Sequence, residues 1–210
     1  PSRISLYQQS LECDQVMFAN DNTNSFLSIN GRASESPSDS LVATLKDLEI
    51  KYILTLVNFN VVHFAGKASG QAIFNNFMAG GTPNIHANLS VENLSIQEGP
   101  LGNANITAKW DEKIEGISVE GRIVDLYRVP DALTGREKNI TGITTVNGWI
   151  SPARNDIQIN VGTHNTNASF IHGFLGGIFK EVNGYVTGPI SIIGPLNDVN
   201  IVGDAVPHMN

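Results

Sequence analysis

The chain has 210 residues, a formal net charge of −7 and only 16% charged residues. Because binding to nucleic-acid phosphates needs clustered lysine and arginine, the acidic balance argues against a nucleic-acid partner. The single cysteine, Cys13, excludes a disulfide framework and a cysteine-based metal site within these residues.

Residues 1–25 begin in the middle of a pattern. They lack the basic start and the apolar run of a signal peptide, and no window of the chain is apolar for long enough to span a membrane. We therefore interpret these residues as the start of a fragment of a longer protein.

From residue 26 onward, alternation of apolar and polar residues predicts a mostly β chain with one or two short helices. The helical patterns lie at 51–62 and 168–179. Segments rich in glycine, proline or charge predict the breaks between strands. We expect breaks at 34–40, 80–83, 100–102 and 111–116, and an exposed charged loop at 128–141.

A short phrase recurs along the chain as ATLKDLEI (43–50), LSVENLSI (89–96) and, more weakly, VGTHNTNA (161–168). In each copy the apolar alternation slips by one residue, at Asp47, Asn93 and Asn165. A β-bulge produces such a slip, and Asp and Asn tolerate the unusual backbone angles that a bulge can require. The phrase therefore predicts strands that are bulged in the middle.

A longer repeat supports this pattern. A shift of 118 residues superposes 52–70 on 170–188 without a gap and pairs Gly66 with Gly184 and Gly70 with Gly188. The repeated unit is a strand, a short helix and a strand, and internal repeats are typical of architectures that grow along one direction. We divide the chain into a first repeat region (26–127), the charged loop (128–141) and a second repeat region (142–206).

The sequence contains no convincing catalytic or metal-binding cluster. The five histidines lie too far apart for a metal-ligand motif, and no G-x-S-x-G nucleophile elbow is present. Asp111, Glu112 and Glu115 surround Lys113 in a turn-like stretch, where solvation explains them better than paired acid catalysis does. We expect no enzyme activity, no cofactor and no metal.

An apolar row recurs on strand after strand and is the candidate ligand-binding groove. Its residues are Leu41, Ala43, Leu45, Leu48, Ile50, Ile85, Ala87, Leu89, Val91, Leu94, Ile96, Ile106, Ala108, Trp110, Ile157, Ile159, Val161, Ile190, Ile192, Val199 and Ile201. These residues fill the core of a sandwich or β-solenoid, or they line an open, curled sheet that takes up acyl chains. The small side chains of Ala43, Ala87 and Ala108 would leave room in the second case.

The order of the C-terminal motifs resembles a known family. Residues 160–205 contain a polar strand end, an aromatic-rich helical stretch, V-x-G-x-x-x-G-x-I-x-I-x-G-P-L (182–196) and V-x-I-x-G-x-A (199–205). This order is similar to the C-terminal repeats of the TamB/AsmA-like family, the translocation and assembly module proteins of diderm bacteria. Residues 41–72 and 82–102 are similar to the preceding repeat.

The resemblance implies a β-taco, an open trough of β-sheet with a hydrophobic interior. It implies a periplasmic protein whose full-length form is anchored in the inner membrane by an N-terminal helix absent here. The implied function is phospholipid transfer between the inner and outer membranes, assembly of outer-membrane proteins, or both. The implied partners are acyl chains and a BamA-like outer-membrane protein of the TamA type, bound through regions outside these residues. The alternative is a structural or adhesive β-solenoid with a self-filled core.

Overall fold

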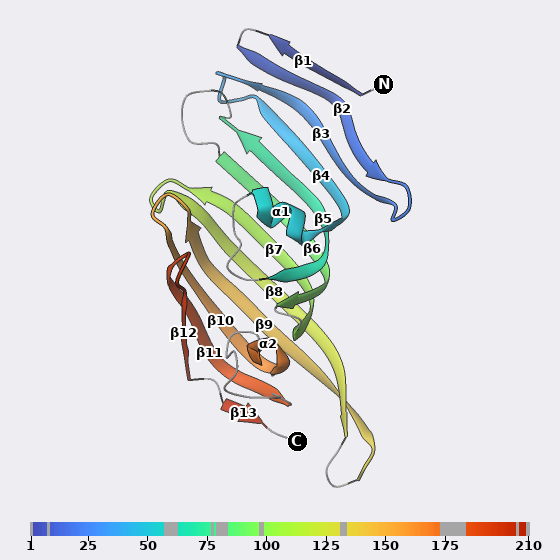
Figure 1. Ribbon diagram of the computed structural model, residues 1–210, viewed down its shortest axis with the longest axis vertical. Coiled ribbons are helices and arrows are strands. Elements are labelled where there is room, and N and C mark those ends of the chain that lie inside the picture. The colour runs from blue at the N-terminus through green and yellow to red at the C-terminus, as the bar shows by residue number, and fades with distance from the viewer. Residues whose placement is uncertain are drawn as a thin grey trace.

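The computed structural model describes residues 2–7, 9–56, 63–76, 78, 84–96, 99–130, 134–172, 184–204 and 206–208. In this part of the chain, strands β1 to β12 pair in chain order, each with the next, and β13 pairs with β11 (Figure 1). All of these pairs are antiparallel. The sheet is open, because β1 and β12 end the path without pairing with each other. The predicted fold class, a mostly β chain forming an elongated and curled sheet, is confirmed.

The strands are mostly long. They are β1 (Arg3–Tyr7), β2 (Ser10–Asn20), β3 (Ser25–Ser34), β4 (Ser40–Glu49), β5 (Phe64–Asn75), β6 (Asn84–Ile96), β7 (Gly99–Asp111), β8 (Gly116–Pro130), β9 (Glu137–Ser151), β10 (Asp156–Asn167), β11 (Tyr185–Pro195), β12 (Asn200–Gly203) and β13 (Val206–His208). Helices α1 (Ile50–Leu56) and α2 (Ser169–His172) follow β4 and β10. The strands succeed one another along the longest axis of the molecule, from the N-terminus at one end to the C-terminus at the other (Figure 1).

The predicted bulges are confirmed. Asp47, Asn93 and Asn165 have positive φ angles of 49°, 52° and 48°. The pairing register shifts at each of them, between Leu45 and Leu48, between Val91 and Leu94, and between Thr163 and Thr166. Because one extra residue is inserted, the side chains that flank each bulge point to the same face of the sheet.

The 118-residue repeat is confirmed as a repeat of pairing. On β4 and β5, Leu45 pairs with Gly70 and Leu48 with Ala68. On β10 and β11, the residues 118 positions later form the same pairs, Thr163 with Gly188 and Thr166 with Val186. The unit β4–α1–β5 therefore recurs as β10–α2–β11, with a short helix at the same place in each unit.

Two of the breaks expected between strands are wrong: the turn at 100–102 and the extent of the charged loop at 128–141. Residues 100–102 do not form a turn, because β7 begins at Gly99 and Pro100 pairs with Ser95. Proline and glycine are typical of turns, which is why a turn was expected. However, a proline at the start of a strand costs the sheet few backbone hydrogen bonds. Gly102 has a φ of 108° and lies beside a bulge. The breaks expected at 34–40 and 111–116 fall between β3 and β4 and between β7 and β8.

The charged loop is also shorter than 128–141. Strand β8 continues to Pro130 and β9 starts at Glu137, so Arg128 and Lys138 lie in paired strands. This hairpin extends beyond the neighbouring strands (Figure 1). Its charges are exposed to water on both strands, and Arg128 forms a cross-strand ion pair with Glu137 at 3.2 Å. A high charge density therefore marks an extended hairpin here, not a break in the sheet.

Other expectations are described in part. The two helical patterns begin as α1 and α2, while 57–62 and 173–179 lie outside the described residues. The turn expected at 80–83 also lies outside them. Residues 1–25, expected only to start in mid-pattern, contain β1 and β2.

Candidate functional site

Two rows of cross-strand partners make one face of the sheet apolar from β2 to β12. We call this side, together with the other residues that share it, the apolar face. The first row, the central apolar row, is Val16, Ile29, Ala43, Ala72, Ala87, Ala108, Val119, Gly148, Ile159, Ile192 and Ile201. The second is Phe18, Leu27, Leu45, Gly70, Leu89, Ile106, Gly121, Val146, Val161, Ile190 and Gly203.

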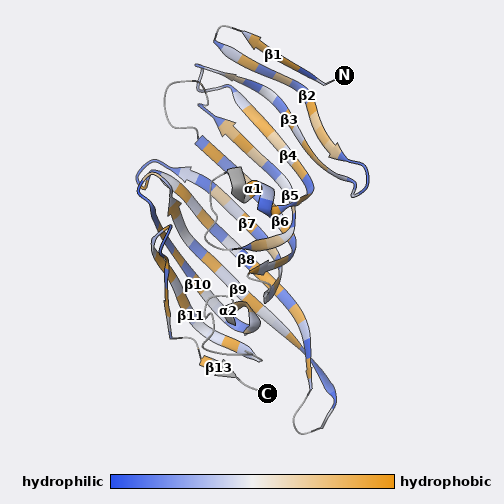
Figure 2. Cartoon of the chain, viewed as in Figure 1, coloured by the Kyte–Doolittle hydropathy of each residue, from blue (hydrophilic) through white to orange (hydrophobic). Residues whose placement is uncertain are grey.

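The row between them points to the opposite side and is polar from β3 to β11. This polar row is Ser28, Thr44, Gln71, Asn88, Thr107, Glu120, Asn147, Asn160 and Ser191. Hydrogen bonds link its members, as from Thr107 Oγ1 to Asn88 Oδ1 at 3.0 Å and from Ser191 Oγ to Asn160 Oδ1 at 3.0 Å. Figure 2 shows the resulting bands of opposite hydropathy along the strands. The sheet is thus two-sided along nearly its whole length.

The structure brings the predicted groove residues of the strands together on the apolar face. Two predicted residues differ from the rest. Ile50 is the first residue of α1 and packs against this face, and Val199 precedes the first residue of β12. At the last strand the face is more open, since Ile201 is 39% exposed.

The two helices cover one part of the apolar face, beside the bulges. Ile50 of α1 and Phe170 of α2 are buried in one cluster with Ala68, Val91 and Ile123. Strand β7 approaches α2 so closely that a Cβ built on Gly99 would lie 2.3 Å from the Cα of Phe170. Away from the helices the burial of the face is uneven: Ile157 and Ile159 are buried, whereas Leu27, Leu89 and Ile192 are half-buried.

Small residues cluster in the middle of the apolar face. Ala43, Ala72 and Ala87 are consecutive partners in the central apolar row and form a buried cluster, with Ala108 packed against them. Gly121 lies in the second row, and a Cβ built on it would meet its nearest neighbour at 3.5 Å, an ordinary contact distance. Because no steric clash requires glycine at this position, the missing side chain leaves space over the face.

Several residues of the apolar face were absent from the predicted groove. On β5 these are Ala68 and Ala72, which alternate with Lys67, Ser69 and Gln71. Their period of two was present in the sequence, but small residues give a weak hydrophobic signal. On β9, Val146 and Ile150 are separated by Gly148. Because glycine has no apolar side chain, the alternation of apolar and polar residues was not recognised there.

A polar spot interrupts the apolar face on β8. Burial raises the pKa of the Asp125 carboxyl above its ordinary value. Burial, with the nearby Asp125 and Tyr185, raises the pKa of Tyr127 to about 12. The Tyr127 hydroxyl donates a hydrogen bond to the carbonyl of Asn165 at 2.7 Å, so this spot ties β8 to the bulge of β10.

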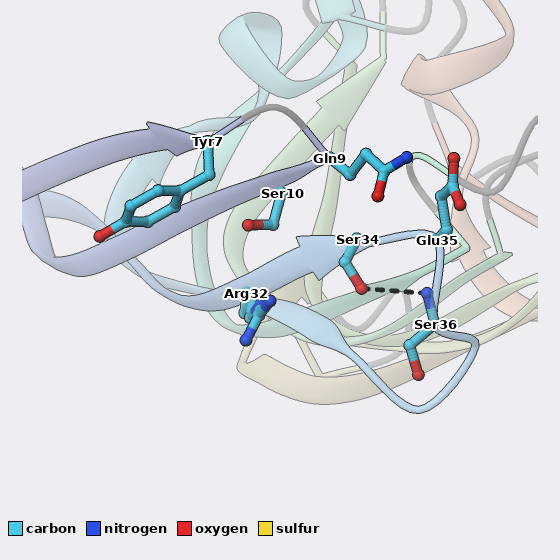
Figure 3. Close-up of a pocket in the computed structure, with 7 residues that line it drawn as sticks. All are labelled: Tyr7, Gln9, Ser10, Arg32, Ser34, Glu35 and Ser36. Atoms are coloured by element: carbon cyan, nitrogen blue, oxygen red, sulfur yellow. Dashed lines mark hydrogen bonds between the residues drawn. The ribbon is translucent and has the colours of Figure 1, made fainter.

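A cavity of about 560 Å³ lies at the N-terminal end of the sheet (Figure 3). It is lined by Tyr7, Gln9, Ser10, Arg32, Ser34, Glu35 and Ser36. Hydrogen bonds and an ion pair engage Ser34, Ser36 and Arg32 on its β3–β4 side. Ser34 Oγ accepts a hydrogen bond from the amide of Ser36 at 3.0 Å and donates one to Asp39 at 2.8 Å, and Arg32 pairs with Asp39 at 3.4 Å. These contacts explain the ordering of the loop between β3 and β4 without a ligand.

Among the described residues, no group of three or more His, Cys, Asp or Glu side chains is placed to hold a metal ion. Within the same residues, no helix has both the length and the apolar character needed to cross a membrane. The apolar face is therefore the most extensive feature that calls for a functional explanation. Comparison with protein-family models, with curated proteins and with solved structures finds no match to this chain.

Proposed function

We propose that the apolar face carries the acyl chains of phospholipids. In this proposal the chain is a bridge-like, periplasmic segment that acts between the inner and outer membranes of a diderm bacterium. Lipid transfer operates alone or together with the assembly of outer-membrane proteins beside a BamA-like partner of the TamA type. The order of the motifs at 160–205, which resembles the TamB/AsmA-like family, supports this assignment.

One observation carries the proposal. The central apolar row is uninterrupted from β2 to β12, while the polar row beside it faces the other side from β3 to β11. An open sheet with one apolar face needs a covering layer. The described helices cover only the part near the bulges, and an acyl chain is a suitable cover for the rest because it is apolar, thin and flexible.

The energetics of such a surface suit both binding and movement. Each buried CH₂ group contributes roughly 0.8 kcal/mol, so ten of them contribute about 8 kcal/mol. Successive positions along the face present similar apolar partners, such as Ala87, Ala108 and Val119. A chain that slides by one strand exchanges one set of contacts for a similar one, so the barrier to movement stays low.

The alternative, a structural or adhesive β-solenoid, requires a self-filled interior. Parallel β-helices stack coils of parallel strands, whereas in the described part of the chain all strand pairs are antiparallel and the sheet is open. The architecture therefore favours the open trough over the solenoid.

The test places one positive charge on the apolar face. In the variants Leu89→Arg and Ile159→Arg, a guanidinium lies where acyl chains would pack, so we expect phospholipid that co-purifies with the detergent-free protein to fall to background. The strand content, measured by circular dichroism, should survive. Extraction and mass spectrometry of bound lipid per mole of protein gives the readout.

Matched controls carry the same charge on the other face. Asn88 and Gln158 each precede one of these residues on the same strand and point away from the apolar face. Asn88→Arg and Gln158→Arg should therefore keep wild-type lipid. Lipid retained in both apolar-face variants would refute the proposal.

A further inference from the structure

The cavity at the N-terminal end of the sheet lies on the side opposite the apolar face. Tyr7, Ser10 and Ser34 are cross-strand partners on β1, β2 and β3. Their chain neighbours Leu11 and Ala33 belong to a hydrophobic cluster of the apolar face. Since successive residues of a strand point to opposite sides, the row of Tyr7 opens to the polar side. The cavity is therefore separate from the surface proposed to carry lipid.

The cavity is large enough for a small molecule, and one of its walls is preformed. Its volume of about 560 Å³ falls within the range of roughly 300–1,000 Å³ that is typical of ligand sites. The loop after β3 forms this wall and is held by protein contacts, because Ser34 Oγ accepts from the amide of Ser36 and donates to Asp39. A wall that is fixed before binding lowers the entropic cost of binding.

Ser10 places an unpartnered hydroxyl in this cavity. The residue is only 5% exposed, and its side chain is one of those that line the cavity (Figure 3). Its hydroxyl has no hydrogen-bond partner in the described part of the chain, yet it is not sealed off from solvent. Because buried polar groups are nearly always paired, the partner of this hydroxyl is a group that enters the cavity.

Four further side chains bring donors and acceptors to the cavity. Within the described residues, the side chains of Tyr7, Gln9 and Glu35 form no hydrogen bond or ion pair. Arg32 pairs with Asp39 through Nε at 3.4 Å, but a guanidinium has five N–H donors, so others remain for a ligand. In Figure 3, Tyr7 and Arg32 lie on one side of the group, and Gln9 and Glu35 lie on the other.

The charges around the cavity disfavour an anionic ligand. The lining contributes one guanidinium, from Arg32, and one carboxylate, from Glu35. The same guanidinium is already paired with Asp39, and Arg32 lies opposite Glu12 in the pairing of β2 and β3. Three carboxylates therefore surround this guanidinium, and an anion would meet more repulsion than attraction.

The mixture of donors and acceptors favours hydroxyl groups over an ammonium. An ammonium only donates, so it would leave the N–H groups of Arg32 and Gln9 unused. A hydroxyl both donates and accepts, so it pairs equally well with Ser10, with the Gln9 amide and with the Glu35 carboxylate. The ring of Tyr7, which is 55% exposed, adds a flat apolar surface that suits the C–H face of a sugar ring.

We infer that this cavity binds a neutral sugar residue. The hydroxyl of Ser10 and the polar ends of Gln9, Arg32 and Glu35 form hydrogen bonds with the sugar hydroxyls, and Tyr7 packs against the C–H face of the sugar. The source is either a free sugar or the end of a glycan chain, since both present the same hydroxyls. The site does not depend on lipid carriage, because it lies on the other side of the sheet.

Titration of the 210-residue chain with neutral methyl glycosides tests the inference. The probes are the methyl glycosides of glucose, galactose, mannose and N-acetylglucosamine, and saturation-transfer NMR measures their binding. We expect Ser10→Ala and Glu35→Gln each to weaken binding roughly two- to tenfold, the effect of losing one hydrogen bond. Tyr7→Ala should weaken it roughly tenfold, because the apolar ring is lost.

Tyr52→Ala is the matched control for Tyr7→Ala. Tyr52 is also 55% exposed and is not among the residues that line the cavity, so its variant should bind sugar like the wild-type protein. Circular dichroism checks the strand content of each variant. Because Tyr7 and Glu35 are exposed, their variants should keep the fold, and the test stands even if Ser10→Ala does not fold.

An array of immobilised oligosaccharides that end in the same sugars distinguishes the two sources. Binding to both the free glycosides and the array identifies a site for free sugar, and binding to the array alone identifies a site for the end of a glycan. Binding to neither would overturn the inference.

Two further results would contradict the inference. Wild-type binding by both Tyr7→Ala and Glu35→Gln would show that the sugar binds elsewhere. Tighter binding of glucosamine or of glucose 6-phosphate than of methyl glucoside would refute the assignment to a neutral ligand. Each of these results would leave the proposed lipid carriage standing, since that proposal concerns the opposite face.

Discussion

The hydroxyl of Ser69 on β5 accepts a hydrogen bond from the backbone amide of Asp47 at the bulge of β4, at 3.0 Å. The residue 118 positions after Ser69 does the same in the second unit, where Thr187 accepts from the amide of Asn165 at 3.0 Å. Asn103 and Asn30 likewise accept from the amides of Asn93 and Gln15, at 3.0 and 2.7 Å. In each case the acceptor is the single residue opposite the bulge, so a polar side chain replaces the lost pairing.

Loss of this side chain should destabilise the sheet. In Ser69→Ala the amide of Asp47 loses its acceptor, and in Thr187→Val the amide of Asn165 does, so we expect each free energy of unfolding to fall by about 1–2 kcal/mol. Urea denaturation followed by circular dichroism measures the change. Ser69→Thr and Thr187→Ser keep a hydroxyl and should remain within about 0.5 kcal/mol of the wild-type protein.

Ser118→Ala is the matched control for these variants. The Ser118 hydroxyl donates to the carbonyl of Lys109 at 3.2 Å and contacts no bulge. Its removal should therefore change stability by less than about 0.5 kcal/mol. If Ser69→Ala were no more costly than Ser118→Ala, the hydroxyl would not be what supports the bulge.

Two glycines of the apolar face should respond oppositely to alanine. A Cβ at Gly121 makes only ordinary contacts, so Gly121→Ala should stabilise the protein by about 0.4–1 kcal/mol through the unfolded chain. A Cβ at Gly148 would lie 2.0 Å from the carbonyl oxygen of Gln158, so Gly148→Ala should cost about 1–3 kcal/mol. Thermal and urea unfolding of both variants provides the comparison.

The same position tests whether the space over Gly121 matters for function. Gly121→Leu extends a side chain into that space, beside Ile106 and Val146. We expect less bound phospholipid per chain at unchanged strand content, while Gly121→Ala keeps most of the lipid. Unchanged lipid binding by the leucine variant would show that this space is not used.

Stability should fall in alkaline solution through Tyr127. The pKa of its phenol rises from 10.0 to about 12 on folding, mainly through burial, so the folded protein holds this proton more tightly than the unfolded chain. The resulting stabilisation is complete below pH 10 and is lost as pH rises towards 12. Tyr127→Phe removes this titration, so the difference in stability between the wild-type protein and the variant should shrink over that range. A difference that stayed constant between pH 9 and 11.5 would contradict this coupling.

The sequence predicted the bulges at Asp47, Asn93 and Asn165, because Asp and Asn tolerate positive φ angles and because the phrase around them recurs. It missed the bulge at Gln15, whose φ is 48°, because glutamine is not a typical left-handed residue and the recurring phrase is absent there. Local composition also misplaced the hairpin at 128–141, where charge density reflects exposure on both strands and not a lack of pairing.

The sequence predicted which residues form the rows of the apolar face, but it did not predict the contacts between segments far apart in the chain. Period-two alternation identified the apolar side of β4, β6, β7 and β10, because one face of a strand repeats every second residue. The burial of the Trp110 N–H without a hydrogen-bond partner among the described residues was not predictable, since it depends on neighbouring elements. The cover that α2 provides over β7 likewise depends on the close approach at Gly99, a contact between segments far apart in sequence.

Site-specific photocross-linking tests the central claim most directly. Ile106 belongs to the apolar face, and the next residue, Thr107, belongs to the polar row. With a photoreactive benzophenone side chain at one of these two positions, irradiation of cells that produce the protein should attach phospholipid to residue 106 and not to residue 107. Mass spectrometry of the purified chain detects the adduct. Phospholipid attached equally at both positions, or at neither, would contradict lipid carriage on the apolar face.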